Sequence, residues 1–353
     1  MTYHDLRFNF EKRASLFMAR IFGDRWKIER QIAIGGQAFI YLVKDIKTQD
    51  DKNYILKKLK NPKRIGRFEK EIEALTIIRS KYISEIIDYK ISEKGFSYYV
   101  MSFYSEKTLN YILKELKDNF IRCLKIFEKI CKGIKEAHEY EFPIIHRDLK
   151  PDNILIDEND NPKIIDFGLC YFEGEERLTL SMEQVGSRFY IAPECEKGKS
   201  EDIGSHTDVY SLGKILYAMA SGGEIFPRER QNEVEYNLMK ISRNRQAKFI
   251  MEIINKCVKE ETSDRIANVK DLILLTEKII ELLEIGCLPV NYGNDFCRFC
   301  GRGKLVNLGK LLSCGIKDNI TIKNVEDLGL HLWTCNYCGH VHFFVNKIYE
   351  DHS

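Results

Sequence analysis

The sequence predicts an α+β protein with a small strand-rich part, a larger helical part after it and a small β unit at its C-terminal end. Three observations predict this arrangement. Branched and aromatic residues on both sides of the glycine pair at 35–36 are typical of strands. Apolar residues then recur at helical spacing along several stretches. Beyond a change in composition near Gly286, a Cys-x-x-Cys-Gly sequence occurs in duplicate.

The length and composition limit the class of protein. At 353 residues the chain exceeds one average domain, which predicts a large two-lobed domain with a smaller attachment. Hydrophobic residues make up 44% and charged residues 31%, as in ordinary globular proteins. The formal net charge of +2 argues against bare nucleic acid or an acidic membrane as the main partner.

The chain contains no recognisable signal peptide or membrane span. Charged residues interrupt the apolar positions of residues 1–17, and also those of the long apolar stretch at 272–285. We therefore predict a soluble cytoplasmic protein without a membrane partner. Of the 11 cysteines, four form two close pairs, which indicates reduced thiols together with a metal site.

The N-terminal residues 1–24 are expected to form a helical extension. Apolar residues from Leu16 to Phe22 follow a loosely helical spacing that ends near Gly23. Packing against the adjacent lobe is the plainer interpretation of this apolar stripe. A substrate-binding or dimerising role is the alternative.

The elements expected after this extension follow from their residue patterns. Strand patterns occupy residues 26–43, 54–57 and 97–104, and helical patterns occupy 108–117, 121–140 and 268–284. A polar stretch at residues 146–153 follows the second of these predicted helices.

This loop, at residues 146–153, carries the side chains best suited to catalysis. Its sequence His-Arg-Asp-Leu-Lys-Pro-Asp-Asn holds Asp148, Lys150 and Asn153. A carboxylate can accept the proton of an attacking hydroxyl, a lysine can offset charge on a moving phosphate, and an amide oxygen can hold Mg²⁺. The loop thus indicates phosphoryl transfer, with Asp148 and Lys150 as catalytic residues and Asn153 as a metal ligand.

A second motif follows at residues 163–168, where a short apolar run ends in Asp166, Phe167 and Gly168. A carboxylate at the end of a strand suits a second Mg²⁺ ligand. With the Ala-Pro-Glu sequence at 192–194, these motifs resemble those of the eukaryotic-type (Hanks-type) protein kinases. Lys150 is similar to the lysine of the serine/threonine branch of that family.

The resemblance covers about residues 26–285 and implies the two-lobed protein-kinase fold, with ATP as the phosphoryl donor and Mg²⁺ or Mn²⁺ as the metal ion. Lys57 would hold the α- and β-phosphates and would pair with Glu71 from a helix. Met101 would border the adenine ring, and Leu155 would form the apolar floor beneath it.

The nucleotide site departs from the family pattern at its glycine loop. Ile34, Gly35 and Gly36 retain backbone that can approach phosphates, but alanines replace the two outer glycines. Ile55 also stands where the family usually has a small alanine over the adenine ring. These departures motivate the alternative of a nucleotide-binding pseudokinase that acts as a scaffold.

Residues 166–194 resemble an activation segment. Thr179 and Ser181 are candidate phosphosites, because Arg147 could bind a phosphate on either residue and order the segment. Alternatively, glutamates in the same segment could satisfy Arg147 without phosphorylation.

Two further residues match the family pattern, and the resemblance implies that they stabilise the structure and take no part in the chemistry. Asp208, at the start of a helix, would tether the backbone of the catalytic loop. Arg265 would form an ion pair with Glu194.

The C-terminal unit contains the cysteine pairs Cys297/Cys300 and Cys335/Cys338, each followed by glycine. Such pairs can direct four thiolates at one structural Zn²⁺, and the glycines allow the tight turns. Short apolar runs between and after the pairs predict the strands of a zinc ribbon, which is too small to be stable without such a staple. Free thiols or a redox pair are the alternative.

We therefore predict three regions, namely the N-terminal helical extension at 1–24, a protein kinase domain at 25–285 and a zinc-ribbon domain at 291–350. The predicted function is a serine/threonine protein kinase that acts on protein substrates and autophosphorylates, with a ribbon that docks a partner or regulates the kinase. A kinase that senses nucleic acid through the ribbon is a further alternative. The ribbon's nearly balanced charge argues against it.

Overall fold

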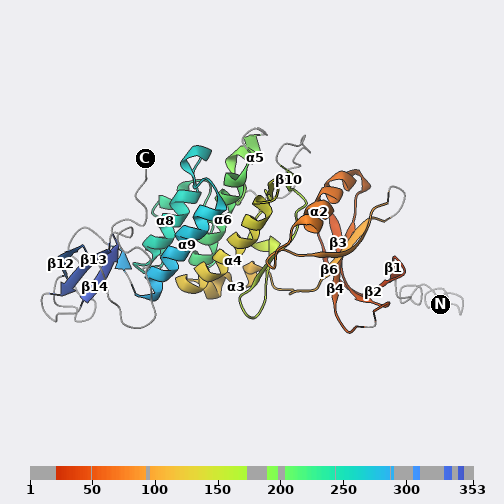
Figure 1. Ribbon diagram of the computed structural model, residues 1–353, viewed down its shortest axis with the longest axis horizontal. Coiled ribbons are helices and arrows are strands. Elements are labelled where there is room, and N and C mark those ends of the chain that lie inside the picture. Colours follow the sequence, from red (N-terminus) through yellow and green to blue (C-terminus); the bar gives the residue numbers. More distant parts are fainter. Residues whose placement is uncertain are drawn as a thin grey trace, which may run out of the picture. The chain divides into compact units, whose positions relative to one another are not determined.

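The computed structural model describes residues 21–48, 50–92, 96–172, 189–197, 203–242, 244–286, 288–289, 305–310, 330–335 and 341–345. The chain divides into two compact units (Figure 1). The first contains the chain up to residue 106 together with residues 163–170, and the second contains residues 107–162 and the chain from residue 171 onward. The predicted strand-rich part and helical part are therefore both present.

The first unit is built on a six-stranded antiparallel sheet in the order β1-β2-β3-β4-β6-β5. Its strands are β1 (Ile21–Phe22), β2 (Trp26–Ile34), β3 (Ala38–Asp45), β4 (Tyr54–Leu59), β5 (Ile86–Lys90) and β6 (Tyr98–Ser102). One face of the sheet buries a core that includes Trp26, Val43 and Leu56. Because side chains alternate along a strand, Lys57 lies on the face opposite to Leu56.

One long helix, α2 (Ile65–Ile77), accompanies this sheet in the first unit (Figure 1). A short 3₁₀ helix, η1 (Pro62–Arg64), leads into it. The buried residues of α2 include Phe68, Glu71, Ile72 and Leu75, which recur at the spacing of one helix face. The same periodicity that builds this apolar face therefore also buries the carboxylate of Glu71.

The N-terminal extension was predicted as a helix through residue 24, and this is wrong at its end. Ile21 and Phe22 form β1, which pairs with the start of β2. The ring centroid of Phe22 lies 5.8 Å from that of Tyr98, so this apolar residue packs on the sheet. Gly23, with φ 59°, begins the turn between the strands. Residues 1–20 lie outside the described residues.

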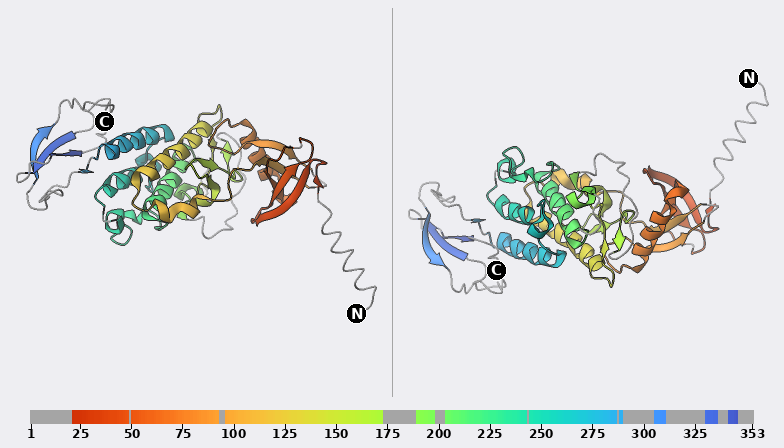
Figure 2. Two further views of the ribbon diagram at one scale, coloured as in Figure 1. Left: turned by 90° about the horizontal axis from the view of Figure 1, so that it is seen from below. Right: turned by 90° about the horizontal axis from the view of Figure 1, so that it is seen from above.

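The second unit is mainly helical, as predicted. Its helices are α3 (Leu109–Leu116), α4 (Phe120–His138), α5 (Pro193–Lys197), α6 (Ser205–Ser221), α7 (Leu238–Ser242), α8 (Ala247–Cys257) and α9 (Val269–Glu284). α6 is buried along nearly its whole length. In the views of Figure 2, α4 and α9 run side by side, and they are among the most extensively packed pairs of elements. The helices predicted at 108–117, 121–140 and 268–284 are confirmed by α3, α4 and α9.

Short strands flank the two motif-bearing loops. They are β7 (Ile144–Ile145), β8 (Ile154–Ile156), β9 (Pro162–Ile164) and β10 (Tyr171–Phe172). β7 pairs with β10 in antiparallel register. The catalytic loop predicted at 146–153 thus begins directly after a paired strand.

The C-terminal end of the chain contributes a small sheet in the order β11-β14-β13-β12. Its strands are β11 (Leu288–Pro289), β12 (Leu305–Lys310), β13 (Leu330–Cys335) and β14 (Val341–Val345). β13 pairs antiparallel with both β12 and β14. β12 and β14 lie at apolar runs for which the sequence predicted strands, whereas no strand was predicted for β11 or β13.

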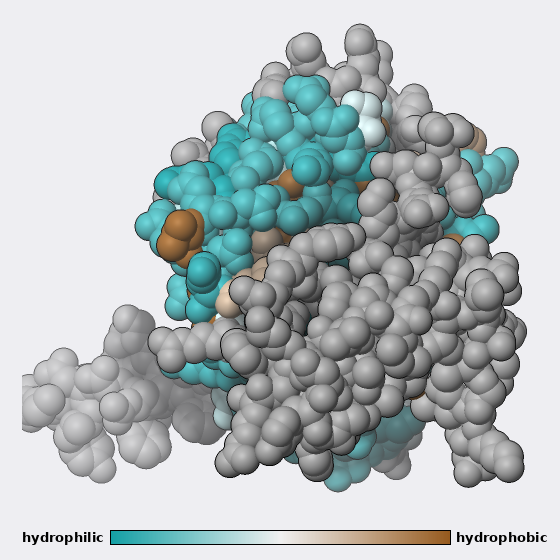
Figure 3. Space-filling model, turned by 90° about the vertical axis from the view of Figure 1, so that its left-hand side faces the viewer, coloured by the Kyte–Doolittle hydropathy of each residue, from teal (hydrophilic) through white to brown (hydrophobic). Residues whose placement is uncertain are grey.

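The described surface is mainly polar on the face that Figure 3 shows. Where that view is coloured, hydrophilic residues dominate and apolar residues are scattered. Within the described residues, no helix combines the length and the apolar content that crossing a membrane requires.

Candidate active site

The first unit contains a cluster of charged side chains around Lys57. The Lys57 Nζ donates to Glu71 Oε1 at 2.6 Å and to Asp166 Oδ1 at 3.0 Å. The lysine comes from β4, the glutamate from α2, and the aspartate from the segment after β9. The structure thus brings together three of the residues that the sequence predicted for the nucleotide and metal site.

The electrostatics of this cluster separate the roles of its two carboxylates. Burial raises the pKa of Glu71 to about 7, although Lys57 opposes the shift. Burial also acts to raise the pKa of Asp166, but the charge and hydrogen bond of Lys57 outweigh it and hold that pKa below its usual range. The side chain of Asp166 is 44% exposed, whereas that of Glu71 is 3% exposed. Asp166 is therefore the carboxylate that a solvated cation can reach.

The backbone around Asp166 fits a metal ligand. Its φ of 67° lies in the left-handed region, which is costly for a residue other than glycine and is typical of functional sites. A Cβ on Gly168 would lie 3.0 Å from Asp166 Oδ1 and 3.6 Å from Glu71 Oε2. The glycine therefore leaves space beside the two carboxylates. An exposed carboxylate with this space fits a divalent cation with oxygen ligands.

A pocket opens beside the same cluster. Its lining includes Gln37, Lys57, Arg64, Arg67 and Glu71. Three of these side chains are cationic and one is anionic, so the lining favours an anion over a cation. Phosphate groups are anions that arginine and lysine bind well.

The predicted phosphate loop is the turn between β2 and β3. The Gly35 N–H donates to Ala38 O at 3.0 Å, and Lys60 Nζ donates to Gly35 O at 2.5 Å. The side chain of Ile34 lies in the open, with 61% of its surface exposed. A Cβ on Gly35 would meet only Ala38 O, at an ordinary 3.7 Å. The contact of Ile34, Gly35 and Gly36 with phosphates stays a prediction.

The residues predicted to contact adenine lie in separate units. Ile55 and Met101 are directly opposite each other on β4 and β6, and both are 7% exposed. The larger side chain at Ile55 therefore lies beside Met101. Leu155 belongs to β8 of the second unit, where it bridges to Thr108. The adenine-binding roles of Met101 and Leu155 stay predictions.

The second unit holds the catalytic loop. Lys150 Nζ donates to Asp148 Oδ2 at 2.7 Å. Asn153 Nδ2 donates to the backbone oxygen of Asp148 at 2.8 Å and to its Oδ2 at 3.1 Å. A short 3₁₀ helix, η2 (Pro151–Asn153), positions the asparagine. Since the amide nitrogen of Asn153 bonds within the loop, its oxygen is the atom available to coordinate a metal ion.

Asp208 on α6 holds the backbone of this loop, as expected. Its carboxylate accepts hydrogen bonds from His146 N at 2.8 Å and from Arg147 N at 2.9 Å. Arg147 has a φ of 63°, a strained conformation that needs such support. Burial acts to raise the pKa of Asp208, but the hydrogen bond with His138 and the other donors hold it below its usual range.

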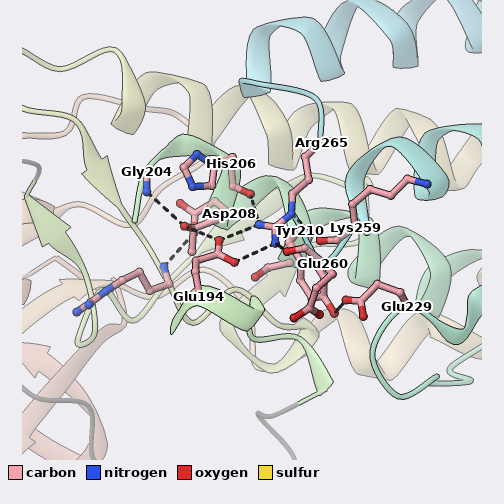
Figure 4. Close-up of polar contacts among 12 residues, drawn as sticks. Glu194, Gly204, His206, Asp208, Tyr210, Glu229, Lys259, Glu260 and Arg265 are labelled. Carbon is pink, nitrogen blue, oxygen red and sulfur yellow. Dashed lines mark hydrogen bonds and ion pairs between the residues drawn. The ribbon is translucent and has the colours of Figure 1, made fainter. Parts of the chain in front are cut away.

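The expected ion pair between Arg265 and Glu194 is also present (Figure 4). The two hydrogen bonds measure 2.7 and 2.9 Å, and the side chains are 0% and 5% exposed. Arg265 donates further to the backbone oxygens of Lys259, His206 and Glu260. All five N–H groups of the guanidinium are thus engaged, which identifies the pair as a structural element.

For three side chains of these networks the sequence predicted no role. Tyr99 donates to Glu71 Oε1 at 2.9 Å, His138 contacts Asp208 at 2.8 Å, and Thr207 donates to Glu194 at 2.9 Å. Tyr99 shares a strand with Met101, and His138 ends the helix before the catalytic loop. The sequence contains no signal for their long-range partners, since these lie between 13 and 70 residues away.

Several predicted residues lie outside the described residues, namely Thr179, Ser181, Cys297, Cys300 and Cys338. Cys335 ends β13. In the part of the chain that the structure describes, no group of three or more His, Cys, Asp or Glu side chains is arranged to hold a metal ion. The predicted zinc ligands are therefore not tested by the structure.

Comparison with known proteins identifies the family of this chain. The family described as the protein kinase domain matches residues 26–284. Because this match covers well over half of the chain, the chain belongs to the protein kinase family.

Relatives come from several bacteria. A probable serine/threonine-protein kinase of Clostridium acetobutylicum is 30% identical over 290 residues, covering 78% of this chain and 41% of the relative. Serine/threonine-protein kinase A of Synechocystis is 30% identical over 58% of this chain and 42% of the relative. Serine/threonine-protein kinase PrkC of Bacillus subtilis is 33% identical over 56% of this chain and 30% of the relative. The chain spans less than half the length of each.

Proposed function

We propose that this chain is a serine/threonine protein kinase that transfers the γ-phosphoryl group of ATP to protein hydroxyls and also phosphorylates itself. The observation that carries the proposal is the Lys57, Glu71 and Asp166 cluster in a member of the protein kinase family. The second unit contributes the loop with Asp148, Lys150 and Asn153. Both sets have the side chains that phosphoryl transfer requires.

Each of these residues has a distinct role in the proposed reaction. Lys57, oriented by Glu71, would bind the α- and β-phosphates. Asp148 would orient the attacking hydroxyl and accept its proton, while Lys150 would offset charge on the transferred group. Asp166 and Asn153 would hold Mg²⁺ or Mn²⁺, which when bound neutralises charge on the phosphates.

The choice of serine and threonine as acceptors rests on two supports. Lys150 matches the residue of the serine/threonine branch, and the relatives above are named serine/threonine-protein kinases. Autophosphorylation would fall on Thr179 or Ser181, where a phosphate could bind Arg147. In the structure, the Cζ atom of the Arg147 guanidinium lies 5.5 Å from the centre of the Tyr171 ring.

The test is transfer of labelled phosphate from ATP and Mg²⁺ by the purified chain. Asp148→Asn should reduce transfer by about 10³-fold or more, since the hydroxyl loses its acceptor. Asp152→Asn, four residues along and exposed, is the matched control and should stay within about two-fold of the parent. Tight ATP binding without any Asp148-dependent transfer would favour the pseudokinase scaffold instead.

The same reaction tests the activation segment. Mapping of labelled residues should place phosphate on Thr179 or Ser181. A Thr179→Ala, Ser181→Ala double variant should then transfer phosphate to substrate more slowly. An undiminished rate would mean that glutamates of the segment satisfy Arg147 and that the kinase is constitutively active.

We further propose that Cys297, Cys300, Cys335 and Cys338 bind one structural Zn²⁺ in a ribbon that docks a protein partner or regulates the kinase. The strand register supports this proposal. Leu305, which begins β12, lies opposite Cys335 at the end of β13. Only residues 301–304 separate Cys300 from Leu305, so the first cysteine pair directly precedes, in sequence, the strand whose start lies opposite Cys335.

The second cysteine pair adds to this argument. Thr334 on β13 lies opposite Val341 on β14, so Cys338 belongs to the connection between these two strands. Both cysteine pairs are thereby linked to one end of the sheet. Four thiolates leave no open position on zinc, which makes a structural ion the appropriate assignment.

Metal analysis of the purified chain tests the zinc site. We expect about one zinc ion per chain, lost in Cys297→Ser and in Cys335→Ser. Cys314→Ser is the matched control, because it removes a cysteine of the same region that belongs to neither pair. Zinc retained in full by the paired-cysteine variants would refute the assignment.

Nucleic acid remains the alternative partner of the ribbon. Filter binding of nucleic acid at two salt concentrations tests this alternative. Binding through phosphates must weaken as salt rises. The cytoplasmic location of the chain also stays a prediction.

A further inference from the structure

Tyr99 makes a hydrogen bond that the proposed chemistry does not itself require. Its hydroxyl donates to Glu71 Oε1 at 2.9 Å, and the same oxygen accepts the 2.6 Å hydrogen bond from Lys57. Tyr99 is 1% exposed and Glu71 is 2% exposed. A buried carboxylate must have its hydrogen bonds satisfied, so the phenol contributes directly to keeping Glu71 in place.

The ring of Tyr99 makes a second contact with the same helix. It stacks on the ring of Phe68, with 5.4 Å between centroids and 30° between planes. Phe68 precedes Glu71 by three residues, so the two lie on one face of α2. A single side chain of the sheet therefore contacts the helix through both a hydrogen bond and an aromatic stack.

The backbone of Tyr99 is held in place by strand pairing in the sheet. Tyr99 on β6 lies directly opposite Lys57 on the neighbouring β4. The Lys57 ammonium also lies 5.6 Å from the centre of the Tyr99 ring. The lysine and the tyrosine thus rise from paired strands to meet the same glutamate, and neither strand can shift without breaking the ladder.

We propose that Tyr99 is a positioning residue that holds α2 so that Glu71 pairs with Lys57 before any nucleotide binds. The proposal rests on the kinase function above, because it assigns the residue that orients its lysine. Lys57 is shared with Asp166, so without the phenol the ammonium can turn toward Asp166 alone. Glu71 would then leave its buried position, and α2 would move with it.

The sharpest variant is Tyr99→Phe, which keeps the aromatic stack and removes only the hydroxyl. Tyr98→Phe is the matched control. It makes the same chemical change at the preceding residue, whose side chain belongs to the core on the other face of the sheet. A third variant, Tyr99→Leu, also removes the stack and should have the larger effect.

Hydrogen–deuterium exchange of the nucleotide-free protein gives a readout independent of catalysis. In Tyr99→Phe the amides of α2 should exchange about five-fold faster or more, because the buried hydrogen bond to Glu71 is lost. Exchange in α4 and α9 should stay unchanged, which excludes general unfolding. In Tyr98→Phe the amides of α2 should exchange at the same rate as in the parent protein.

Kinetics give the second readout. Tyr99→Phe should raise the KM for ATP several-fold while the KM for the protein substrate stays unchanged, since only the phosphate anchor is disturbed. The proposal would be overturned if, in Tyr99→Phe, the amides of α2 exchanged at the rate of the parent protein and the KM for ATP were unchanged. Faster exchange in α2 without any Asp148-dependent transfer would leave the positioning role intact and refute the kinase function.

Discussion

At Lys57 a single ammonium serves two carboxylates, and this sharing determines what the site can do. The buried partner, Glu71, orients the lysine, while the exposed partner, Asp166, remains accessible to a cation. Lys58 is the next residue, yet it faces the other side of the sheet, where its Nζ lies 3.6 Å from the centre of the Phe96 ring. Strand alternation alone therefore separates the lysine that pairs with the two carboxylates from a half-buried lysine that packs on an aromatic ring.

The first residue-scale prediction compares these two lysines. Lys57→Met should lower phosphoryl transfer by about 10²-fold or more, because the electrostatic anchor of the phosphates is lost. Lys58→Met should stay within about two-fold of the parent. Initial rates with saturating protein substrate measure both. Equal losses in the two variants would contradict the assignment of Lys57.

The second residue-scale prediction concerns Arg265. Lysine has one nitrogen in place of a planar fork, so Arg265→Lys cannot replace five hydrogen bonds. We expect the free energy of unfolding to fall by about 1–3 kcal/mol, since the buried Glu194 keeps a cation beside it but loses the two-pronged hydrogen bond of the guanidinium. Urea denaturation measures this change. Arg230→Lys, which alters an exposed pair with Glu233, is the control and should leave the unfolding curve unchanged.

At the scale of elements, α6 is the helix on which the second unit is organised. A Cβ on Gly213 would lie 2.5 Å from the Cβ of Cys257, so this glycine allows α6 and α8 to pack closely. The neighbouring Lys214 is only 3% exposed and donates to the backbone oxygens of Phe226 at 2.5 Å and Arg228 at 3.2 Å. Burial lowers the pKa of Lys214 to about 7, although Glu229 opposes the shift.

The buried lysine predicts a pH dependence of stability. Its pKa in the unfolded chain is about 10.4, so between pH 7 and 10 the unfolded state binds the extra proton. The contribution of Lys214 to the free energy of unfolding should therefore rise with pH, by at most about 1.4 kcal/mol per pH unit. Below pH 7 the lysine is charged in both the folded and the unfolded state, so the folded state bears the full free-energy cost of burying that charge.

Lys214→Met isolates this contribution. The variant loses two hydrogen bonds at every pH, but it also loses the titrating group. Urea denaturation at pH 7, 8 and 9 should show the parent gaining stability with pH relative to Lys214→Met. Parallel stability curves would show that Lys214 titrates near its ordinary pKa in the folded state.

At the scale of the whole molecule, the chain combines parts of very different size. The region that matches the kinase family, residues 26–284, has a core of many buried apolar residues, whereas the predicted ribbon at 291–350 has only about sixty residues, close to the size at which a core alone is marginal. This difference is the physical reason to expect a structural metal ion in the predicted ribbon.

Removal of the proposed zinc ion should therefore act locally. A chelator should make the amides of residues 305–310, 330–335 and 341–345 exchange freely, while α4 and α9 keep their protection. Hydrogen–deuterium exchange before and after chelation, with zinc added back, measures this. Equal loss of protection in α4 and α9 would mean that the two parts fold as one cooperative unit.

The sequence alone determined those features whose physics is local. Asp148, Lys150 and Asn153 lie within six residues, so one loop conformation sets their mutual distances. The helices α3, α4 and α9 follow from apolar periodicity, because their burial repeats with the helical turn. Family membership likewise follows from short motifs that occur in a fixed order.

Only the tertiary structure decided the features that depend on partners far along the chain. Ile21 and Phe22 have spacing compatible with a helix, but the edge of the sheet supplied hydrogen bonds that made them a strand. Glu69 and Glu73 also lie on α2 and are exposed, whereas Glu71 is buried, so the packing of the helix selects the partner of Lys57. The contact of Tyr99 with Glu71 spans 28 residues. Such contacts depend on how strands and helices pack, which no local pattern encodes.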